Sequence, residues 1–135
     1  MPTIQVKYKG DLRTAALHLK SSSEIITDAP TDNYGKGETF SPTDLVAASL
    51  ASCMLTVMGI KANNAGFQFK GAETEVTKKM ASNPRRISMI EIKMKISPAD
   101  YNDEQKKILK NAAIQCPVAK SLNEDIEQVV DFEWL

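Results

Sequence analysis

The stretch Ser41–Lys61, SPTDLVAASLASCMLTVMGIK, decides the expected fold because it joins several helix-start signals to a long apolar run. Ser41 is suited to be an N-cap, Pro42 stands at the first helical position, and Asp44 follows three residues after the cap. We predict a helix from this start to about Asn64, where Asn and Gly residues favour a left-handed end. A helix so apolar, with small residues that let other backbones approach, is expected at the centre of the molecule.

Two cysteines are the candidate reactive groups of the chain. Cys53 lies halfway along the apolar run, and Cys116 lies in the later stretch AAIQCPVAKSL. The residues alone leave two interpretations open, since free cysteine often fills a core and a thiol pair can also do redox chemistry. Pro117 predicts a helix start at Cys116, and a helix N-terminus lowers a thiol pKa below its usual ~8.5. This local argument makes Cys116 the better nucleophile, because Cys53, in mid-helix among apolar residues, needs a nearby cation to ionise.

Length and composition limit the classes of function. The 135 residues predict a single domain, 1–135, and the 42% hydrophobic and 25% charged residues are typical of a globular protein that needs no disulfide scaffold. Lys and Arg (17) balance Asp and Glu (17), so no overall positive field attracts nucleic acid. The N-terminal MPTIQVKYKG lacks the layout of a signal peptide, which favours the cytoplasm, where thiols stay reduced.

Membrane insertion and metal binding are not expected. The most apolar window, Leu45–Ile60, is shorter than the ~20 residues that cross a bilayer, and it contains Ser, Thr and Gly. The sequence has only His18 as a histidine, and it has no CxxC or HExxH spacing. We therefore predict a buried helix and no metal site.

The rest of the pattern predicts strands and shorter helices. The expected strands are Ile4–Tyr8, Leu12–Lys20, Ser23–Thr27, Gln68–Met80, Ile87–Ile96 and Ile126–Leu135. Alternation is clearest in Ile87–Ile96, where one face should point inward and the other outward. The residues expected to point inward are Ile90, Ile92, Met94 and Ile96, and those expected to point outward are Glu91, Lys93 and Lys95. A capping box at Asn102 and Gln105 predicts a second helix, which Pro117 interrupts. The loop Asp28–Phe40, DAPTDNYGKGETF, is long enough to suggest a functional role.

Two motifs resemble those of a known family. The block SPTDLVAASLASC with its long helix, and the later QCPVAKSLN, are similar to the two cysteine motifs of the OsmC/Ohr family of osmotically inducible and organic hydroperoxide resistance proteins. The order of elements fits this family over nearly the whole chain. The resemblance implies an α+β fold with antiparallel sheets around a central cysteine-bearing helix. It also implies two chains that intertwine into a homodimer with active sites at the subunit interface.

The resemblance also implies a reaction and the roles of its residues. Cys53 matches the peroxidatic cysteine and Cys116 the resolving cysteine, so an organic hydroperoxide would be reduced through a Cys53 sulfenic acid and a Cys53–Cys116 disulfide. An external dithiol, often a dihydrolipoyl group in this family, would reduce the disulfide, and the resemblance implies no metal or organic cofactor. The family places an arginine from the N-terminal strands beside the peroxidatic sulfur, and Arg13 is the candidate because a guanidinium stays charged.

One position departs from the family pattern. Hydroperoxide reductases of the family carry a glutamate that pairs with the arginine, in an N-P-E block before the helix, and the matching residue here is Thr43. Asp44 is better explained as a capping residue, which leaves Glu38 in the loop as the candidate partner of Arg13. The departure indicates a divergent OsmC-like branch. It leaves open an alternative function, a non-catalytic dimer that senses redox state or binds a small molecule.

Overall fold

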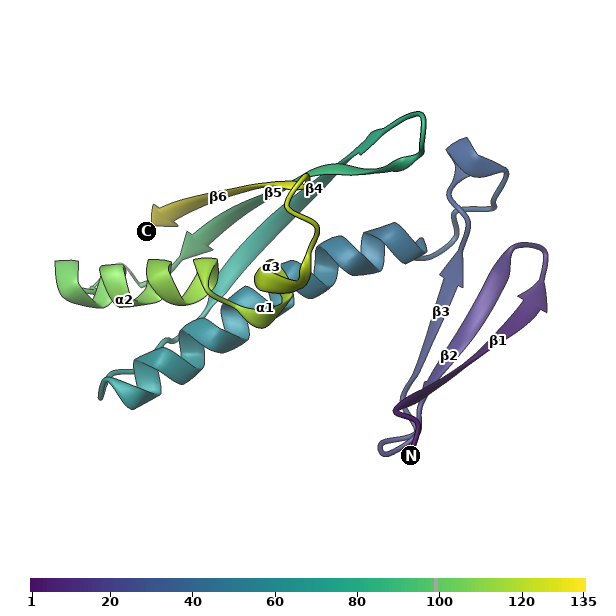
Figure 1. Ribbon diagram of the computed structural model, residues 1–135. Coiled ribbons are helices and arrows are strands. Elements are labelled where there is room, and N and C mark those ends of the chain that lie inside the picture. The colour runs from purple at the N-terminus through teal and green to yellow at the C-terminus, as the bar shows by residue number, and fades with distance from the viewer. Residues whose placement is uncertain (99) are drawn as a thin grey trace. The chain divides into compact units, whose positions relative to one another are not determined.

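A computed structural model gives the structure of residues 1–98 and 100–135, which form two compact units, Met1–Val46 and Ala47–Leu135 (Figure 1). The elements in chain order are β1 (Ile4–Gly10), β2 (Arg13–His18), β3 (Glu24–Asp28), the 3₁₀ helix η1 (Thr31–Asn33), α1 (Pro42–Asn64), β4 (Ala72–Ala81), β5 (Arg86–Ile96), α2 (Asp103–Ile114), α3 (Pro117–Ser121) and β6 (Glu127–Trp134). Two three-stranded sheets together with these helices confirm the predicted α+β class.

The first unit is built on an antiparallel meander in the order β1-β2-β3. Residues directly opposite one another share a face of the sheet, so Val6, Ala16 and Ile25 lie side by side on one face. The exposed apolar residues of this face are Ile4, Val6, Tyr8 and Ile25. Within Met1–Val46, all of which the structure describes, the buried residues are polar: Thr27, Asp28 and Ser41. This unit therefore encloses no apolar core of its own.

The second unit contains the hydrophobic core. Figure 1 shows α2, α3 and the part of α1 that belongs to this unit on one face of the sheet β4-β5-β6. The β5 residues predicted to point inward are fully buried, while Lys93 and Lys95 of the same strand are exposed, which confirms the alternation. The helices contribute Leu50, Met54, Met58 and Leu109 to the same core.

The pairing of β6 differs from the antiparallel sheets expected from the sequence. This strand lies parallel to β5, from the pair Met89 and Glu127 to the pair Ile96 and Trp134. Parallel neighbours need a long crossover connection, and α2 and α3 lie between these two strands in the chain. The second sheet is therefore mixed, whereas the first is wholly antiparallel.

The helix α1 begins and ends where the sequence predicts. Ser41 Oγ accepts the backbone N–H of Asp44 at 3.1 Å, and Asp44 Oδ2 accepts the backbone N–H of Ser41 at 2.9 Å. These reciprocal hydrogen bonds confirm Asp44 as a capping residue. At 23 residues α1 is also long and apolar enough to cross a membrane, so the exclusion of a span on length alone does not hold. One face of α1 is buried in the core of the second unit, as in the central helix of a globular domain.

Candidate functional site

Cys116 lies at the junction between α2 and α3. The N-cap of α2 is the predicted capping box of Asn102 and Gln105, and the helix ends just before Cys116. Cys116 has extended backbone angles and is the N-cap of α3, with Pro117 as the first helical residue. Its Sγ accepts the backbone N–H of Ala119 at 3.4 Å, and the residue is 0% exposed. The predicted helix start is confirmed, but it lies inside the core.

Burial raises the pKa of the Cys116 thiol above its ordinary value. The N–H of Ala119 acts in the opposite direction, while the neighbouring Cys53 side chain raises this pKa further. Removing a sulfur from water disfavours its charged form more strongly than one backbone donor favours it. The helix start therefore does not lower the pKa of Cys116, and which of the two thiols is the nucleophile stays a prediction.

Cys53 lies on α1 at the edge of its buried face. Leu50 and Met54 are buried and Ser52 is exposed, so Cys53 falls at the boundary and is half-buried. Cys53 packs against the buried core that includes Cys116, and its side chain lies close enough to raise the pKa of the Cys116 thiol. The structure thus brings the two predicted cysteines together as free thiols, one partly accessible and one enclosed.

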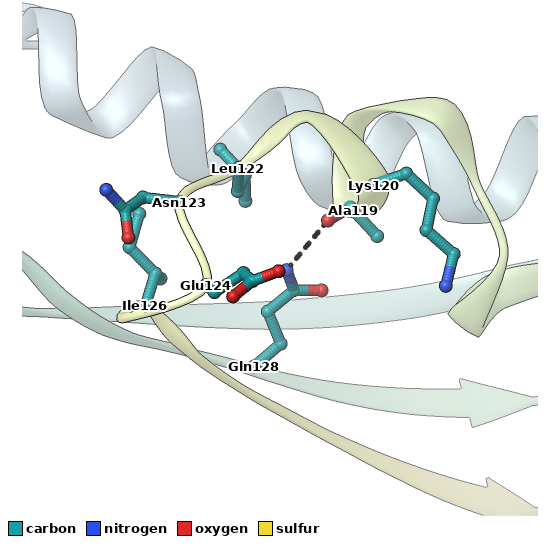
Figure 2. Close-up of a pocket in the computed structure, with 7 residues that line it drawn as sticks. All are labelled: Ala119, Lys120, Leu122, Asn123, Glu124, Ile126 and Gln128. Atoms are coloured by element: carbon teal, nitrogen blue, oxygen red, sulfur yellow. Dashed lines mark hydrogen bonds between the residues drawn. The ribbon is translucent and has the colours of Figure 1, made fainter.

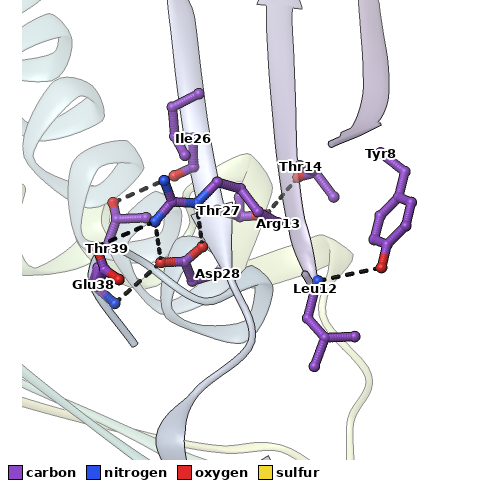
Figure 3. Close-up of polar contacts among 9 residues, drawn as sticks. All are labelled: Tyr8, Leu12, Arg13, Thr14, Ile26, Thr27, Asp28, Glu38 and Thr39. Atoms are coloured by element: carbon purple, nitrogen blue, oxygen red, sulfur yellow. Dashed lines mark hydrogen bonds and ion pairs between the residues drawn. The ribbon is translucent and has the colours of Figure 1, made fainter. Parts of the chain in front are cut away.

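A polar cluster lies in the first unit, where β2 begins and β3 ends (Figure 3). Arg13 and Asp28 are directly opposite in the β2–β3 register. The guanidinium donates from Nε to Asp28 Oδ1 at 2.7 Å and from Nη2 to Asp28 Oδ2 at 2.8 Å. Two parallel bonds of this length form a bidentate ion pair, which fixes geometry as well as charge.

Glu38, the loop carboxylate predicted to approach Arg13, does so at a longer distance. Its Oε2 lies 3.6 Å from Arg13 Nη2, and its side chain is 63% exposed. Its backbone N–H donates to Asp28 Oδ2 at 3.1 Å, so the loop is attached to the same carboxylate. The predicted pairing of Glu38 with Arg13 is present, but Asp28 is the closer partner.

Charge pairing sets the ionisation of this cluster. The hydrogen bonds from Arg13 hold the pKa of the Asp28 carboxyl below its ordinary value, and the N–H of Glu38 adds to this effect. Burial acts in the opposite direction but does not prevail. The Asp28 carboxylate in turn raises the pKa of Arg13. Both groups are therefore charged at neutral pH.

The loop between β3 and α1 is compact, and its backbone hydrogen bonds fix the main chain just before Glu38. The carbonyl of Pro30 accepts the N–H of Gly35, and the carbonyl of Ala29 accepts the N–H of Gly37. A Cβ at Gly35 would overlap the carbonyl oxygen of Ala29, and Gly37 has a φ of 61°. The two glycines of the GKG sequence therefore allow the backbone conformation of this loop.

Asp28 is the residue of the cluster that the sequence analysis missed, because it was assigned to the start of the loop. A signal for it was present in the hairpin. If the antiparallel register is counted back from the turn, where the N–H of His18 bonds the carbonyl of Ser23, Arg13 falls opposite Asp28. Thr43 belongs to the start of α1, where its Oγ1 lies 3.2 Å from Ser41 Oγ.

The two clusters belong to different units of the chain. Arg13, Asp28 and Glu38 lie in Met1–Val46, whereas Cys53 and Cys116 lie in Ala47–Leu135. A cation beside the Cys53 sulfur therefore stays a prediction. In the described ranges, residues 1–98 and 100–135, no three His, Cys, Asp or Glu side chains gather in a group that could hold a metal ion.

A hollow of about 350 Å³ lies beside α3 (Figure 2). Leu122 and Ile126 give it apolar walls, and Lys120 and Glu124 add charged groups of opposite sign. The side chain of Gln128 donates to the carbonyl of Ala119 at 3.1 Å, which ties β6 to the end of the helix that Cys116 caps. This bond holds the segment that follows the buried thiol against the sheet.

Comparison with known proteins identifies close and distant relatives. A family model described as OsmC-like protein matches residues 35–130, a range that includes both cysteines. A crystal structure from Psychrobacter arcticus 273-4, provisionally named an osmotic stress induced and detoxification response protein, is 55% identical, with a TM-score of 0.92 over 98% of this chain and 96% of that chain. No curated protein sequence matches the chain.

Two more distant structures share the fold. The organic hydroperoxide resistance protein OsmC of Legionella pneumophila is 14% identical, with a TM-score of 0.77 over 98% of both chains. An organic hydroperoxide resistance protein from Elizabethkingia anophelis is also 14% identical, with a TM-score of 0.76 over 100% of this chain and 98% of that chain. These similarities confirm the fold expected from the two cysteine motifs.

Proposed function

This chain belongs to the OsmC-like protein family, and from that premise we propose that it is a thiol-dependent peroxidase that reduces organic hydroperoxides. The observation that carries the proposal is that half-buried Cys53 and fully buried Cys116 are close neighbours. A peroxidase of this kind needs one thiol that peroxide can reach and a second thiol that meets only the oxidised product of the first. The unequal exposure of two neighbouring thiols supports this division of roles.

The proposed reaction begins with the Cys53 thiolate. The sulfur attacks one oxygen of the hydroperoxide, the S–O bond forms as the O–O bond breaks, and the released alkoxide takes a proton and leaves as an alcohol. Cys53 is then a sulfenic acid, oxidised by two electrons. The Cys116 sulfur attacks the sulfenic sulfur, so that a disulfide forms and water leaves. An external dithiol, such as a dihydrolipoyl group, reduces the disulfide and is itself oxidised to a disulfide.

The environment of Cys116 supports the resolving role. Its raised pKa keeps the thiol protonated near neutral pH, and its burial keeps it away from peroxide in solution. It therefore does not compete with Cys53 for the substrate. Because the two side chains are neighbours, resolution needs little movement of the main chain. The cytoplasm, where thiols are kept reduced, is the proposed compartment.

Arg13 is the proposed source of the cation that stabilises the Cys53 thiolate. A thiol among apolar neighbours ionises poorly unless a positive charge lies near it. Arg13 stays charged at neutral pH, and its paired carboxylates orient it. Glu38 is proposed to assist through its contact with Arg13.

A second copy of the chain is the proposed partner, in an intertwined homodimer. Ile4, Val6, Tyr8 and Ile25 form an exposed apolar face on the first sheet, and exposed apolar surface of this kind marks an interaction site. Ile60 on α1 is also exposed. Association of two copies would remove this surface from water and complete the core that the first unit lacks.

A thiol count tests the proposed function. Free thiols are measured before and after one equivalent of cumene hydroperoxide, and both Cys53 and Cys116 should disappear and return when dihydrolipoate is added. A Cys53→Ser, Cys116→Ser double variant controls for peroxide loss that does not involve thiols. If the wild-type protein keeps both thiols, it is not a peroxidase, and the alternative of a binding dimer gains support.

A further inference from the structure

The helix α3, which Cys116 caps, is too short to be stable by itself. It has five residues, Pro117–Ser121, and a helix of this length forms too few hydrogen bonds to offset the cost of its first turn. Leu122 already has extended backbone angles, so the chain leaves the helix before a following N–H can reach the carbonyl of Ala119. Ala119 is buried, and a buried carbonyl needs a donor. The donor must therefore come from another element.

Gln128 of β6 supplies this donor (Figure 2). Its Nε2 donates to the carbonyl of Ala119 at 3.1 Å. Gln128 is the register partner of Ile90 in the β5–β6 pair, and Ile90 is fully buried, so the glutamine projects from the face of the sheet that carries the core. The hydrogen bond thus attaches the end of α3 to the sheet of the second unit.

Ala119 connects this hydrogen bond to the buried thiol. Its N–H donates to Cys116 Sγ at 3.4 Å, while its carbonyl accepts from Gln128. Burial raises the pKa of the Cys116 thiol, and the N–H of Ala119 is the largest of the effects that lower this pKa. A displacement of Ala119 would weaken that donor and make the sulfur harder to ionise.

Resolution is the step of the proposed reaction that depends on this donor. The Cys116 sulfur attacks the sulfenic sulfur of Cys53, the S–S bond forms as the S–O bond breaks, and the leaving hydroxide takes the Cys116 proton and becomes water. The attacking sulfur acquires negative charge, and at a residue that is 0% exposed water does not stabilise this charge. The N–H of Ala119 supplies part of the stabilisation instead.

We propose, resting on the function proposed above, that Gln128 is the positioning residue of the resolving step. It holds Ala119 so that the N–H of this residue stays on the Cys116 sulfur while that sulfur attacks Cys53. Gln128 acts through Ala119 and not on the peroxide.

Three possible roles of Gln128 predict different effects on the two chemical steps. A purely structural hydrogen bond would, when removed, lower stability and slow both steps as the protein unfolds. A part in peroxide binding, through the hollow that Gln128 lines, would change the formation of the Cys53 sulfenic acid. Positioning affects the formation of the disulfide alone, because Cys53 lies on α1 and its own reaction with peroxide does not involve Ala119.

The first step is measured in a Cys116→Ser background, where Cys53 is the single thiol and its sulfenic acid persists. Cumene hydroperoxide forms the sulfenic acid, dimedone traps it, and mass spectrometry of the intact protein gives the rate. Gln128→Met, which removes the donor from a side chain of similar length, should change this rate by less than about twofold.

The second step is measured in the protein with both cysteines. One equivalent of hydroperoxide is mixed with the protein, the reaction is stopped with acid, and the remaining thiols are alkylated and counted. Gln128→Met should slow disulfide formation by roughly tenfold, the factor that corresponds to the loss of one neutral hydrogen bond. In excess hydroperoxide this variant should gain more sulfinic acid at Cys53, because a second peroxide oxidises the sulfenic acid before Cys116 attacks it.

The matched control is Gln115→Met, the same change at an exposed glutamine next to Cys116 in the chain, and it should leave both rates nearly unchanged. Gln128→Glu places an acceptor where the donor was, so it should slow disulfide formation at least as much as Gln128→Met. Gln128→Lys restores a donor and should recover part of the rate. Circular dichroism checks that the variants are folded. If Gln128→Met does not fold, Gln128→Asn, which keeps the amide on a shorter side chain, should show the slower disulfide formation.

Diamide separates this proposal from the proposed function, because it oxidises two thiols to a disulfide without peroxide and is itself reduced to the hydrazine. A wild-type protein that does not consume hydroperoxide would refute the peroxidase, while the rate at which diamide joins Cys53 to Cys116 still tests Gln128. The positioning role is overturned if Gln128→Met forms the disulfide at the wild-type rate, if it slows both steps equally, if Gln115→Met has the same effect, or if diamide forms no disulfide in the wild type.

Discussion

In the unit Ala47–Leu135, apolar side chains of α1, β5 and α2 are buried, and the outer face of the sheet carries charged pairs such as Glu73 opposite Lys95. In Met1–Val46 the arrangement is reversed, since Asp28 is buried while Val6 and Tyr8 are exposed. The second unit, Ala47–Leu135, thus contains an apolar core of its own. The first unit, Met1–Val46, is held together by hydrogen bonds and presents an apolar face for a further surface to cover.

The same contrast appears in two enclosed ionisable groups. Cys116 is 0% exposed and Asp28 is 1% exposed, yet burial raises the pKa of the thiol whereas Arg13 holds the pKa of the carboxyl low. The sulfur accepts a hydrogen bond from the neutral backbone N–H of Ala119, while the carboxylate accepts three N–H groups, two of them from a cation. Burial alone does not fix a charge state, because the number and charge of the donors decide it.

The largest expected effect concerns the two thiols. Cys53→Ser should abolish the reaction with cumene hydroperoxide, because buried Cys116 cannot reach the peroxide. Cys116→Ser should still consume one equivalent, stop at a sulfenic acid, and gain further oxygen in excess peroxide. Mass spectrometry of the intact protein distinguishes these products from the wild-type disulfide.

The opposite assignment of roles would be visible in the same experiment. If Cys53→Ser still gains oxygen on Cys116 at the wild-type rate, then the helix start at Pro117 controls reactivity and the burial argument is wrong. Such a result would mean that the buried Cys116 thiol ionises readily, as the buried Asp28 carboxyl does.

The second prediction compares the cores of the two units. Leu50→Ala should lower the free energy of unfolding by about 2–5 kcal/mol, because it leaves a cavity in the core of the second unit. The same change at exposed Leu19, in the first unit, should cost less than about 1 kcal/mol. Urea unfolding measures both, and equal losses would show that the first unit contains a core after all.

The third prediction tests the apolar face of the first sheet. Val6→Lys should weaken the proposed homodimer by roughly a hundredfold, or about 2.7 kcal/mol, because a charge would be placed in the proposed interface. Lys7→Gln, on the other face of the same strand, is the matched control and should leave the dissociation constant nearly unchanged. Sedimentation equilibrium reads both. A wild-type protein that is monomeric at micromolar concentration would exclude this interface.

The fourth prediction uses the acid end of the pH scale. The folded pKa of Asp28 lies below its ordinary value of 3.8, so its pairing with Arg13 contributes stability above that value. The contribution is lost as the pH falls through the lowered folded pKa. The stability difference between wild type and Asp28→Asn should therefore be constant near neutral pH and disappear in acid. A difference that persists well below the folded pKa would show that charge is not its source.

The smallest expected effect lies at the alkaline end. The folded pKa of Cys116 is raised above its ordinary value of 9.0, so the unfolded chain loses the thiol proton first as the pH rises. The wild type should lose stability relative to Cys116→Ser only above that value, and thermal melts from neutral to alkaline pH measure the difference. If the melting temperatures of wild type and Cys116→Ser change in parallel across this pH range, burial does not raise the pKa of the Cys116 thiol.

Local rules explain which features the sequence by itself determined. The capping pair of Ser41 and Asp44, the break at Pro117 and the alternation along β5 each depend on residues close together in the chain. Backbone geometry and hydrophobic period act over a few residues, so these features can be derived without knowing the fold. The two cysteine motifs also indicated the family, and the family predicted the order of the elements.

The tertiary structure decided the features that depend on residues far apart in the chain. The parallel position of β6, the enclosure of Cys116 and the pairing of Arg13 with Asp28 each join distant segments. Local electrostatics predicted a reactive Cys116, and only the packing around it showed that its sulfur loses more from leaving water than it gains from the helix start. Solvation and pairing depend on what surrounds a group in space, and for these residues the surroundings come from other parts of the chain.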